Sequence, residues 1–128
     1  MSYLLDTHAF LWAVMQPGDL SPKVRRLLES PANELVVSAA CAWEIAVKFR
    51  LGRLPDAKAV VDDFDDVVRR LGARTLSITH THALRAGGYR QRHRDPFDRI
   101  LAAQAELEGM PLISKDRALR QFDVELVW

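Results

Sequence analysis

Residues 3–15 read YLLDTHAFLWAVM, and they give the clearest indication of the fold class. It opens with three apolar residues, Tyr3 to Leu5, which predict a short strand buried in a parallel sheet. The strand ends at Asp6, and residues 7–15 then predict a helix that stops before Pro17-Gly18. A strand, an acid and a helix in direct succession are typical of an α/β sheet whose acid lies at the carboxyl end of the strand.

The same alternation runs along the rest of the chain. Further strands are expected at 35–37, 74–77, 112–114 and 124–127, and further helices at 21–29, 39–51, 54–71, 79–86 and 95–108. Helices between strands predict the α/β class, as a three-layer α/β/α sandwich with a mainly parallel central sheet. Residues 1–128 are expected to form a single domain, because they have the length of one and contain no linker.

Composition and charge narrow the classes of function. The 128 residues carry a formal net charge of +1, with 48% hydrophobic and 27% charged residues, as in an ordinary folded domain. Any affinity for nucleic acid must therefore come from a local patch or a bound metal. The single Cys41 is expected to be a buried thiol, and it permits no disulfide within the chain. Neither a membrane-spanning run nor a signal peptide is recognisable, so we expect a cytoplasmic protein.

Four acids fall where a parallel sheet would bring them together. Asp6 and Asp116 follow strands, Glu44 lies on the helix after strand 35–37, and Asp98 lies in the first turn of helix 95–108. Carboxylate ligands without a cysteine pair suit a hard divalent cation, Mg²⁺ or Mn²⁺. Such a cation activates water for attack on a phosphodiester. The pattern predicts a metal-dependent nuclease.

Each acid also has a purely structural explanation. Asp6 and Asp116 could cap helices, and Glu44 could pair with Lys48 one turn later on a largely apolar helix. Asp95 and Asp98 both lie in a first helical turn, where the helix dipole favours negative charge. Capping explains one of those two acids more easily than both, and several carboxylates facing one cavity would repel each other unless a cation were present.

Basic and polar residues near the acids are candidates for contacts with phosphate. Arg85 and Arg90 come before the Asp95–Asp98 turn, and Arg92, Arg94 and Arg99 are candidate contacts with RNA phosphates, unless this is an ordinary solvated loop. Thr7 and Ser114, each beside a strand end, could bind a ligand or cap a helix. His80 and His82 lack the spacing and partners of a zinc site.

At these residues the chain resembles the PIN domain, and in particular the VapC-type toxins of type II toxin–antitoxin pairs. The resemblance spans nearly the whole chain, in the order of the family, and is specific only as a combination. It is carried by four blocks: LLDTH at 4–8, SAACAWEIAVK at 38–48, HRDPFDRILAAQA at 93–105 and LISKD at 112–116.

The resemblance implies a Mg²⁺- or Mn²⁺-dependent endoribonuclease toxin that acts on structured RNA such as tRNA. It implies a cognate antitoxin and a homodimer as partners. It assigns catalysis to Asp6, Glu44, Asp98 and Asp116, metal binding to Asp6, Asp98 and Asp116, and an accessory role to Asp95. Two other classes remain open: a non-catalytic RNA- or protein-binding PIN-like module, and a metal-dependent DNA nuclease or phosphatase.

Overall fold

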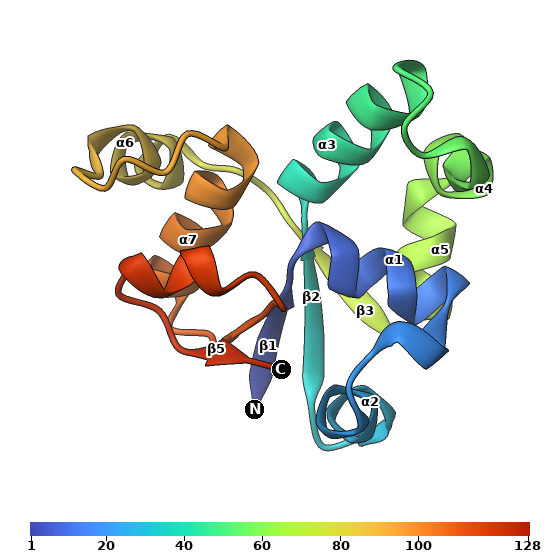
Figure 1. Ribbon diagram of the computed structural model, residues 1–128. Helices are drawn as coiled ribbons and strands as arrows, with labels where there is room; N and C mark the ends of the chain where they lie inside the picture. Colours follow the sequence, from blue (N-terminus) through green and yellow to red (C-terminus); the bar gives the residue numbers. More distant parts are fainter.

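The computed structural model describes residues 1–128, and a five-stranded sheet lies at its centre (Figure 1). Its strands run in the order β3-β2-β1-β4-β5, and every neighbouring pair is parallel. They are β1 (Ser2–Leu5), β2 (Glu34–Ser38), β3 (Ala73–Leu76), β4 (Leu112–Ile113) and β5 (Leu126–Val127). Leu5 is in register with Val37 on one side and Ile113 on the other, so the carboxyl ends of β1, β2 and β4 meet at one edge.

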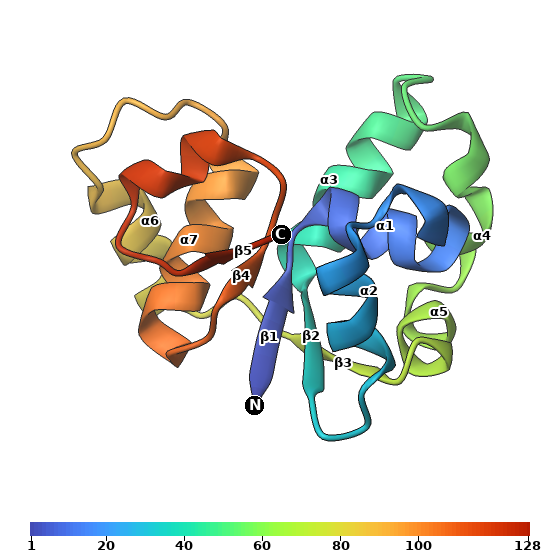
Figure 2. The same cartoon turned by 60° about the horizontal axis from the view of Figure 1, so that its bottom comes forward.

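Seven α-helices connect and flank these strands. They are α1 (Thr7–Met15), α2 (Pro22–Glu29), α3 (Ala39–Arg50), α4 (Lys58–Asp62), α5 (Phe64–Arg70), α6 (His80–Gly88) and α7 (Pro96–Glu108). Short 3₁₀ turns lie at Pro17–Asp19 (η1), Pro55–Ala57 (η2) and Arg117–Gln121 (η3). In both views α6 and α7 lie on one side of β1 and β2, and α1, α4 and α5 lie on the other (Figures 1 and 2). The predicted α/β sandwich is confirmed.

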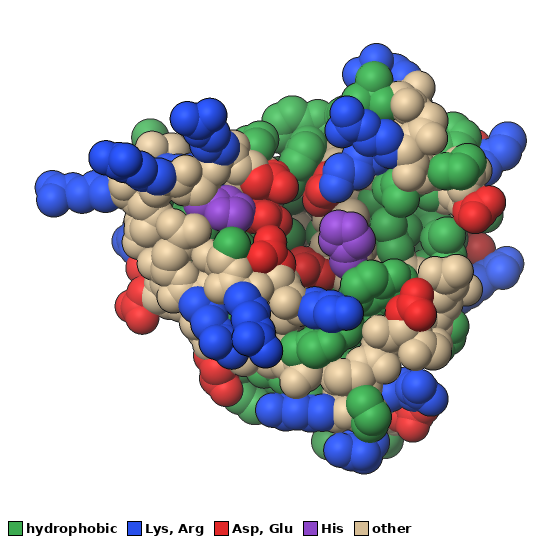
Figure 3. Space-filling model, in the orientation of Figure 1, with side chains coloured by type: hydrophobic (Ala, Val, Ile, Leu, Met, Phe, Trp, Pro, Cys, Tyr) green, Lys and Arg blue, Asp and Glu red, His purple; other side chains and the backbone are tan.

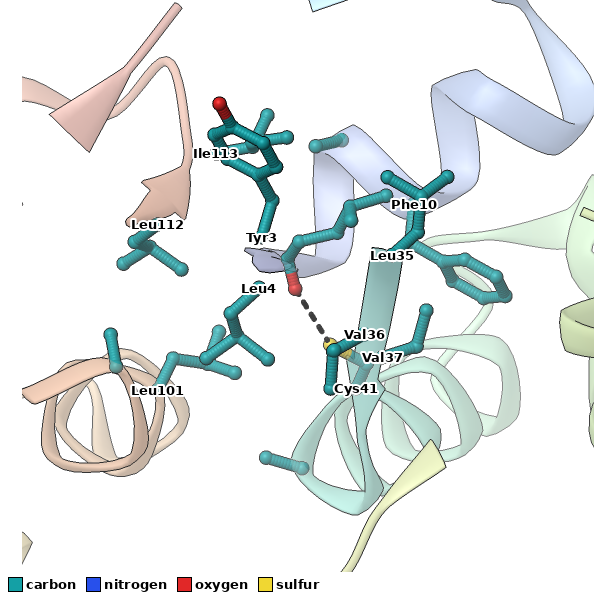
Figure 4. Close-up of a cluster of buried hydrophobic side chains, with 14 of the residues drawn as sticks. Tyr3, Leu4, Phe10, Leu35, Val36, Val37, Cys41, Leu101, Leu112 and Ile113 are labelled. Carbon is teal, nitrogen blue, oxygen red and sulfur yellow. Dashed lines mark hydrogen bonds between the residues drawn. The ribbon is translucent and has the colours of Figure 1, made fainter. Parts of the chain in front are cut away.

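The central strands are buried on both faces, as their apolar sequences predict. Leu4, Leu5, Val36 and Val37 are fully buried and belong to one cluster of 26 buried hydrophobic residues, part of which is drawn in Figure 4. Cys41 lies in this cluster, where its thiol donates to the carbonyl of Leu5 at 3.7 Å. Burial raises the pKa of the Cys41 thiol to about 12, so this residue serves packing, as expected.

Local capping explains where the helices begin and end. Ser21 and Asp95 cap α2 and α7, each followed by proline at the first helical position. Gly109 closes α7 with φ of +66°, a left-handed conformation that glycine adopts without a steric penalty. No helix of the structure is both long and apolar enough to span a bilayer.

The prediction of one continuous helix over residues 54–71 was wrong. The chain breaks at Asp63, whose backbone has φ −149° and ψ 70° and whose carboxylate accepts from Asp66 N at 3.2 Å. Asp63 therefore starts α5 as its N-cap, a role in which aspartate competes well with helix continuation. The periodic apolar pattern gave no sign of this break, because Val60 before it and Val68 after it are both buried in the core. At α6, the two glycines expected to stop the helix lie within its last turn.

Candidate functional site

The four predicted acids line one cavity of about 80 Å³ at the carboxyl edge of the sheet. The cavity has no hydrophobic residue in its lining, which consists of Asp6, Thr7, His8, Glu44, Lys48, Asp95, Asp98 and Asp116. Figure 3 shows this region as a hollow of red acidic side chains between two purple histidines. We call it the acidic pocket. Residues more than a hundred positions apart meet here because β1 lies between β2 and β4.

Asp6 directly follows the end of β1, lines the pocket and is the N-cap of α1. Its Oδ1 accepts from Ala9 N at 2.8 Å, and the residue is only 6% exposed. Burial raises the pKa of Asp6, hydrogen bonding by Ser114 and Ala9 lowers it, and the nearby charge of Glu44 raises it again. The capping explanation is therefore correct for one oxygen of Asp6. It does not account for the placement of this carboxylate in a cavity with other acids.

Glu44 is held by two donors within the protein. Its Oε1 accepts from Thr7 Oγ1 at 2.5 Å, and its Oε2 pairs with Lys48 Nζ at 2.5 Å. The Glu44–Lys48 ion pair, expected as the structural explanation of Glu44, is thus present. Thr7 was expected to contact a ligand or cap a helix, and its hydroxyl instead donates to Glu44. Both oxygens of Glu44 are engaged, whereas Asp98 and Asp116 each have one oxygen without a donor from the protein.

Removal of Lys48 tests how strongly this pair matters. We expect Lys48→Met to lower the free energy of unfolding by about 2 kcal/mol, because Glu44 would remain buried without its counter-ion. This loss of stability is smaller than the usual loss for a fully buried ion pair, because the Lys48 side chain is 29% exposed. Urea unfolding of Lys48→Met, Glu44→Gln and the double variant measures the coupling. Additive losses would show that the pair contributes nothing.

The two acids at the start of α7 have separate roles. Asp95 is the N-cap, and its Oδ1 accepts from the backbone nitrogens of Phe97 at 2.9 Å and Asp98 at 3.3 Å. Asp98 lies one turn further on, and its Oδ2 lies 2.8 Å from Nε2 of His93. Burial raises the pKa of Asp98 to about 6; His93 opposes this shift, and the charges of Asp95 and Asp116 add to it.

This shift predicts a pH dependence of stability in the metal-free protein. Between the ordinary pKa of 3.8 and about 6, the folded state binds the Asp98 proton and the unfolded state does not. The free energy of unfolding should therefore fall as pH rises through that window, by up to about 2 kcal/mol from this group between about pH 4.5 and pH 7. Urea unfolding in EDTA at about pH 4.5 and pH 7 measures the fall. The same fall in Asp98→Asn would contradict the assignment.

Asp116 completes the lining of the pocket, and Ser114 contacts its backbone. The backbone nitrogen of Asp116 donates to Ser114 Oγ at 3.1 Å, and Asp116 Oδ1 accepts from Ala118 N at 2.9 Å to cap η3. Ser114 is 2% exposed, whereas Asp116 is exposed. Ser114 therefore orients the turn that presents Asp116, and Asp116 keeps one oxygen free of protein donors.

The structure corrects the expectation that Arg99 contacts RNA phosphate. Its guanidinium donates to four backbone carbonyls, those of Ala86, Tyr89, Gln91 and His93, at 2.8 to 3.1 Å. Arg99 thus fixes the loop that precedes α7. Arg85 is also engaged, in an ion pair with Glu106. Arg92 and Arg94 are exposed and form no ion pair, so they remain candidates for phosphate contacts.

Sequence reasoning missed His93 as a partner of Asp98, and it missed a second group of basic residues around Lys115. His93 precedes Asp98 by five positions in an irregular loop, so no helical spacing links them. The charges flanking Asp116, in the run Lys115-Asp116-Arg117, were the available signal for the second group.

The donor set of the acidic pocket fits a hard divalent cation in its chemistry. Five carboxylates and one hydroxyl line the pocket, and no thiol does. Burial and mutual repulsion raise the pKa of Asp6 and Asp98, and a divalent charge would offset both effects. No three His, Cys, Asp or Glu side chains converge tightly enough here to form a ready-made metal site. Each of the carboxylates instead turns toward a donor of the protein.

Known proteins with similar sequences and structures support this description. The family model described as "PIN domain" matches residues 3–125. Ribonuclease VapC22 of Mycobacterium tuberculosis is 32% identical over 118 residues, covering 91% of this chain and 88% of that protein. Ribonuclease VapC16 of the same organism is 38% identical over 65 residues, which cover 51% of this chain and 46%, about half, of that relative.

The structural comparison agrees with the sequence comparison. The VapBC2 structure from Rickettsia felis, described as bound to a DNA fragment from its promoter, superposes with a TM-score of 0.72. The match covers 99% of this chain and 98% of that chain at 15% identity, and at this identity it shows a shared fold. Since the PIN model covers almost the entire chain and a relative 32% identical is matched over most of its length, this protein belongs to the PIN domain family.

Proposed function

We propose that the protein is a metal-dependent endoribonuclease toxin of the VapC type. The observation that carries the proposal is the acidic pocket, in which all four predicted acids meet in a cavity without an apolar lining. The relatives of this PIN domain named ribonucleases support RNA as the substrate class, with structured RNA such as tRNA as the expected target.

Asp6, Asp98 and Asp116 would hold Mg²⁺ or Mn²⁺, which when bound supplies positive charge to the phosphate and activates water. Glu44, which is held by Thr7 and Lys48, would orient that water. The Lys48 ammonium also lines the pocket and would contact a substrate phosphate. Attack by water leaves 5′-phosphate and 3′-hydroxyl ends. The chemistry does not require the 2′-hydroxyl, which keeps DNA as the alternative substrate.

The partners follow from the same family. Structures of related folds include one described as a toxin–antitoxin complex, so we propose a cognate antitoxin that inhibits this chain. We also propose a homodimer that acts in the cytoplasm, and contacts of Arg92 and Arg94 with the RNA backbone.

A cleavage panel tests the proposed function. Antitoxin-free protein is incubated with cellular RNA, single- and double-stranded DNA and a small phosphate ester, each with Mg²⁺, Mn²⁺ or EDTA. We expect discrete RNA fragments with 5′-phosphate ends that disappear in EDTA. Cleavage of DNA or of the ester alone would support the alternative enzyme class, and RNA binding without cleavage of any substrate would support the non-catalytic module.

A further inference from the structure

We propose that an unpaired strand of RNA leaves the acidic pocket along an aromatic and basic groove formed by α1, α2, η3 and the end of β5. The bases would stack on His8, Trp12 and Trp128. The phosphates would contact Lys23, Lys115, Arg117 and Arg120. The proposal rests on the proposed ribonuclease function and adds a binding track and a preference for single strands.

The groove is continuous with the acidic pocket. A cavity of about 350 Å³ next to the pocket shares Asp6, His8 and Asp116 with it and adds Trp12 and Lys115. A third cavity of about 370 Å³ shares Lys115 with the second. Its remaining lining is Lys23, Ser114, Arg117, Arg120, Leu126 and Trp128. An RNA strand with one phosphate in the acidic pocket therefore has an open path past Lys115 to the third cavity, which is lined by basic residues.

Three rings follow one another along this path. His8 and Trp12 lie 5.6 Å apart between ring centroids, and Trp12 and Trp128 are also separated by 5.6 Å. Lys115 Nζ lies 5.9 Å from the Trp12 ring, so a cation borders the aromatic surface. His8 is exposed, and both tryptophans are partly exposed. Rings beside cations are the combination that binds unpaired nucleotides without reading their sequence.

The basic side chains of the groove are free to bind phosphate. Lys23, Lys115, Arg117 and Arg120 are all exposed, and none forms an ion pair within the chain. Figure 3 shows Lys and Arg side chains around the acidic hollow on this face. With a net charge of only +1 for the chain, four free cations at one groove form a local positive patch. An acidic peptide would fit these charges as well, but it would make no use of the aromatic rings.

Binding in EDTA separates the groove from catalysis, because the acidic pocket then has no cation and repels phosphate. The probe is a fluorescein-labelled single-stranded RNA of about twelve nucleotides, compared with a hairpin of the same length. The variants are Arg117→Gln/Arg120→Gln, Trp12→Leu and Trp12→Phe. Arg69→Gln/Arg70→Gln is the matched control, since it removes the same charge from α5, where both side chains pair with Asp66 outside the groove.

We expect the Arg117/Arg120 variant to lower the slope of log K against log salt by about 1.4, at about 0.7 per phosphate contact. Trp12→Leu should bind about ten-fold more weakly, and Trp12→Phe should bind almost as well as wild type. RNA should quench tryptophan fluorescence in Trp43→Phe, which keeps only Trp12 and Trp128. The single strand should bind more tightly than the hairpin.

Three results would overturn the groove. The control variant could change the slope as much as the Arg117/Arg120 variant, the Trp12 variants could bind like wild type, or quenching could be absent. If wild type then still cleaves RNA with Mg²⁺, the proposed function stands and only the groove is wrong. If the charge substitutions weaken RNA binding but the Trp12 substitutions do not, the aromatic rings do not stack on the bases and the proposed groove is wrong. Absence of both RNA binding and cleavage would contradict the proposed function itself.

Discussion

Asp6→Asn is expected to lower RNA cleavage about 1,000-fold and leave the protein folded. The substitution removes a carboxylate from the acidic pocket, and the proposed function requires this charge to hold a divalent cation. Asparagine can still accept the hydrogen bond from Ala9 N and cap α1. Burial raises the pKa of Asp6, so a neutral side chain at this position is less costly than the carboxylate. Initial cleavage rates and urea unfolding, both with and without Mg²⁺, measure the two effects.

The control for this variant is Asp56→Asn, which removes the same charge from an exposed position in η2. It should cleave RNA like wild type. If Asp6→Asn unfolded in the absence of metal, the carboxylate of Asp6 would be a structural requirement. If it were folded and active, Asp6 would have no part in catalysis.

Arg99→Lys is expected to lower the free energy of unfolding by about 3 kcal/mol and to reduce cleavage at least ten-fold. Four backbone carbonyls of residues 86–93 accept from the Arg99 guanidinium, and a lysine ammonium cannot reach all four in the same plane. The loop carries His93, which contacts Asp98, and it leads directly into the cap of α7. Its release should therefore misplace Asp98 without altering any acid.

Arg94→Lys serves as the matched control, because Arg94 is exposed in the same loop and forms no ion pair. Urea unfolding and hydrogen exchange of residues 86–95 measure the effect on the loop. We expect faster exchange in Arg99→Lys alone. Unchanged exchange and full activity would mean that Arg99 is available for phosphate, as the sequence had suggested.

The sequence predicts the fold well because most of its signals are local. Apolar runs mark the strands, and Ser21, Thr79 and Asp95 mark helix starts that the structure confirms. The convergence of Asp6, Glu44, Asp98 and Asp116 was also predictable, since parallel strands present their carboxyl ends at one edge. The break at Asp63 was not, because an aspartate in a helical pattern reads equally well as a solvated face or as a cap.

The partners of individual side chains depend on tertiary placement. Arg99 looks like a phosphate contact in the sequence because it lies among other arginines. In the structure the preceding loop folds over Arg99, and backbone carbonyls of that loop accept hydrogen bonds from its guanidinium. Lys23 and Arg120 are 97 positions apart and gain a common role only because the fold brings α2 and η3 to the lining of one cavity. The basic groove therefore has no contiguous sequence signal, whereas the acids follow strand ends and can be found one by one.

End-mapped cleavage of cellular RNA by antitoxin-free protein and by Asp6→Asn, in Mg²⁺, Mn²⁺ and EDTA, tests whether the acidic pocket is a metal-dependent nuclease site. We expect discrete fragments with 5′-phosphate ends from wild type with either metal, and none with EDTA or with the folded variant. Equal cleavage by both proteins, or cleavage that persists in EDTA, would contradict a metal-dependent nuclease site at the acidic pocket.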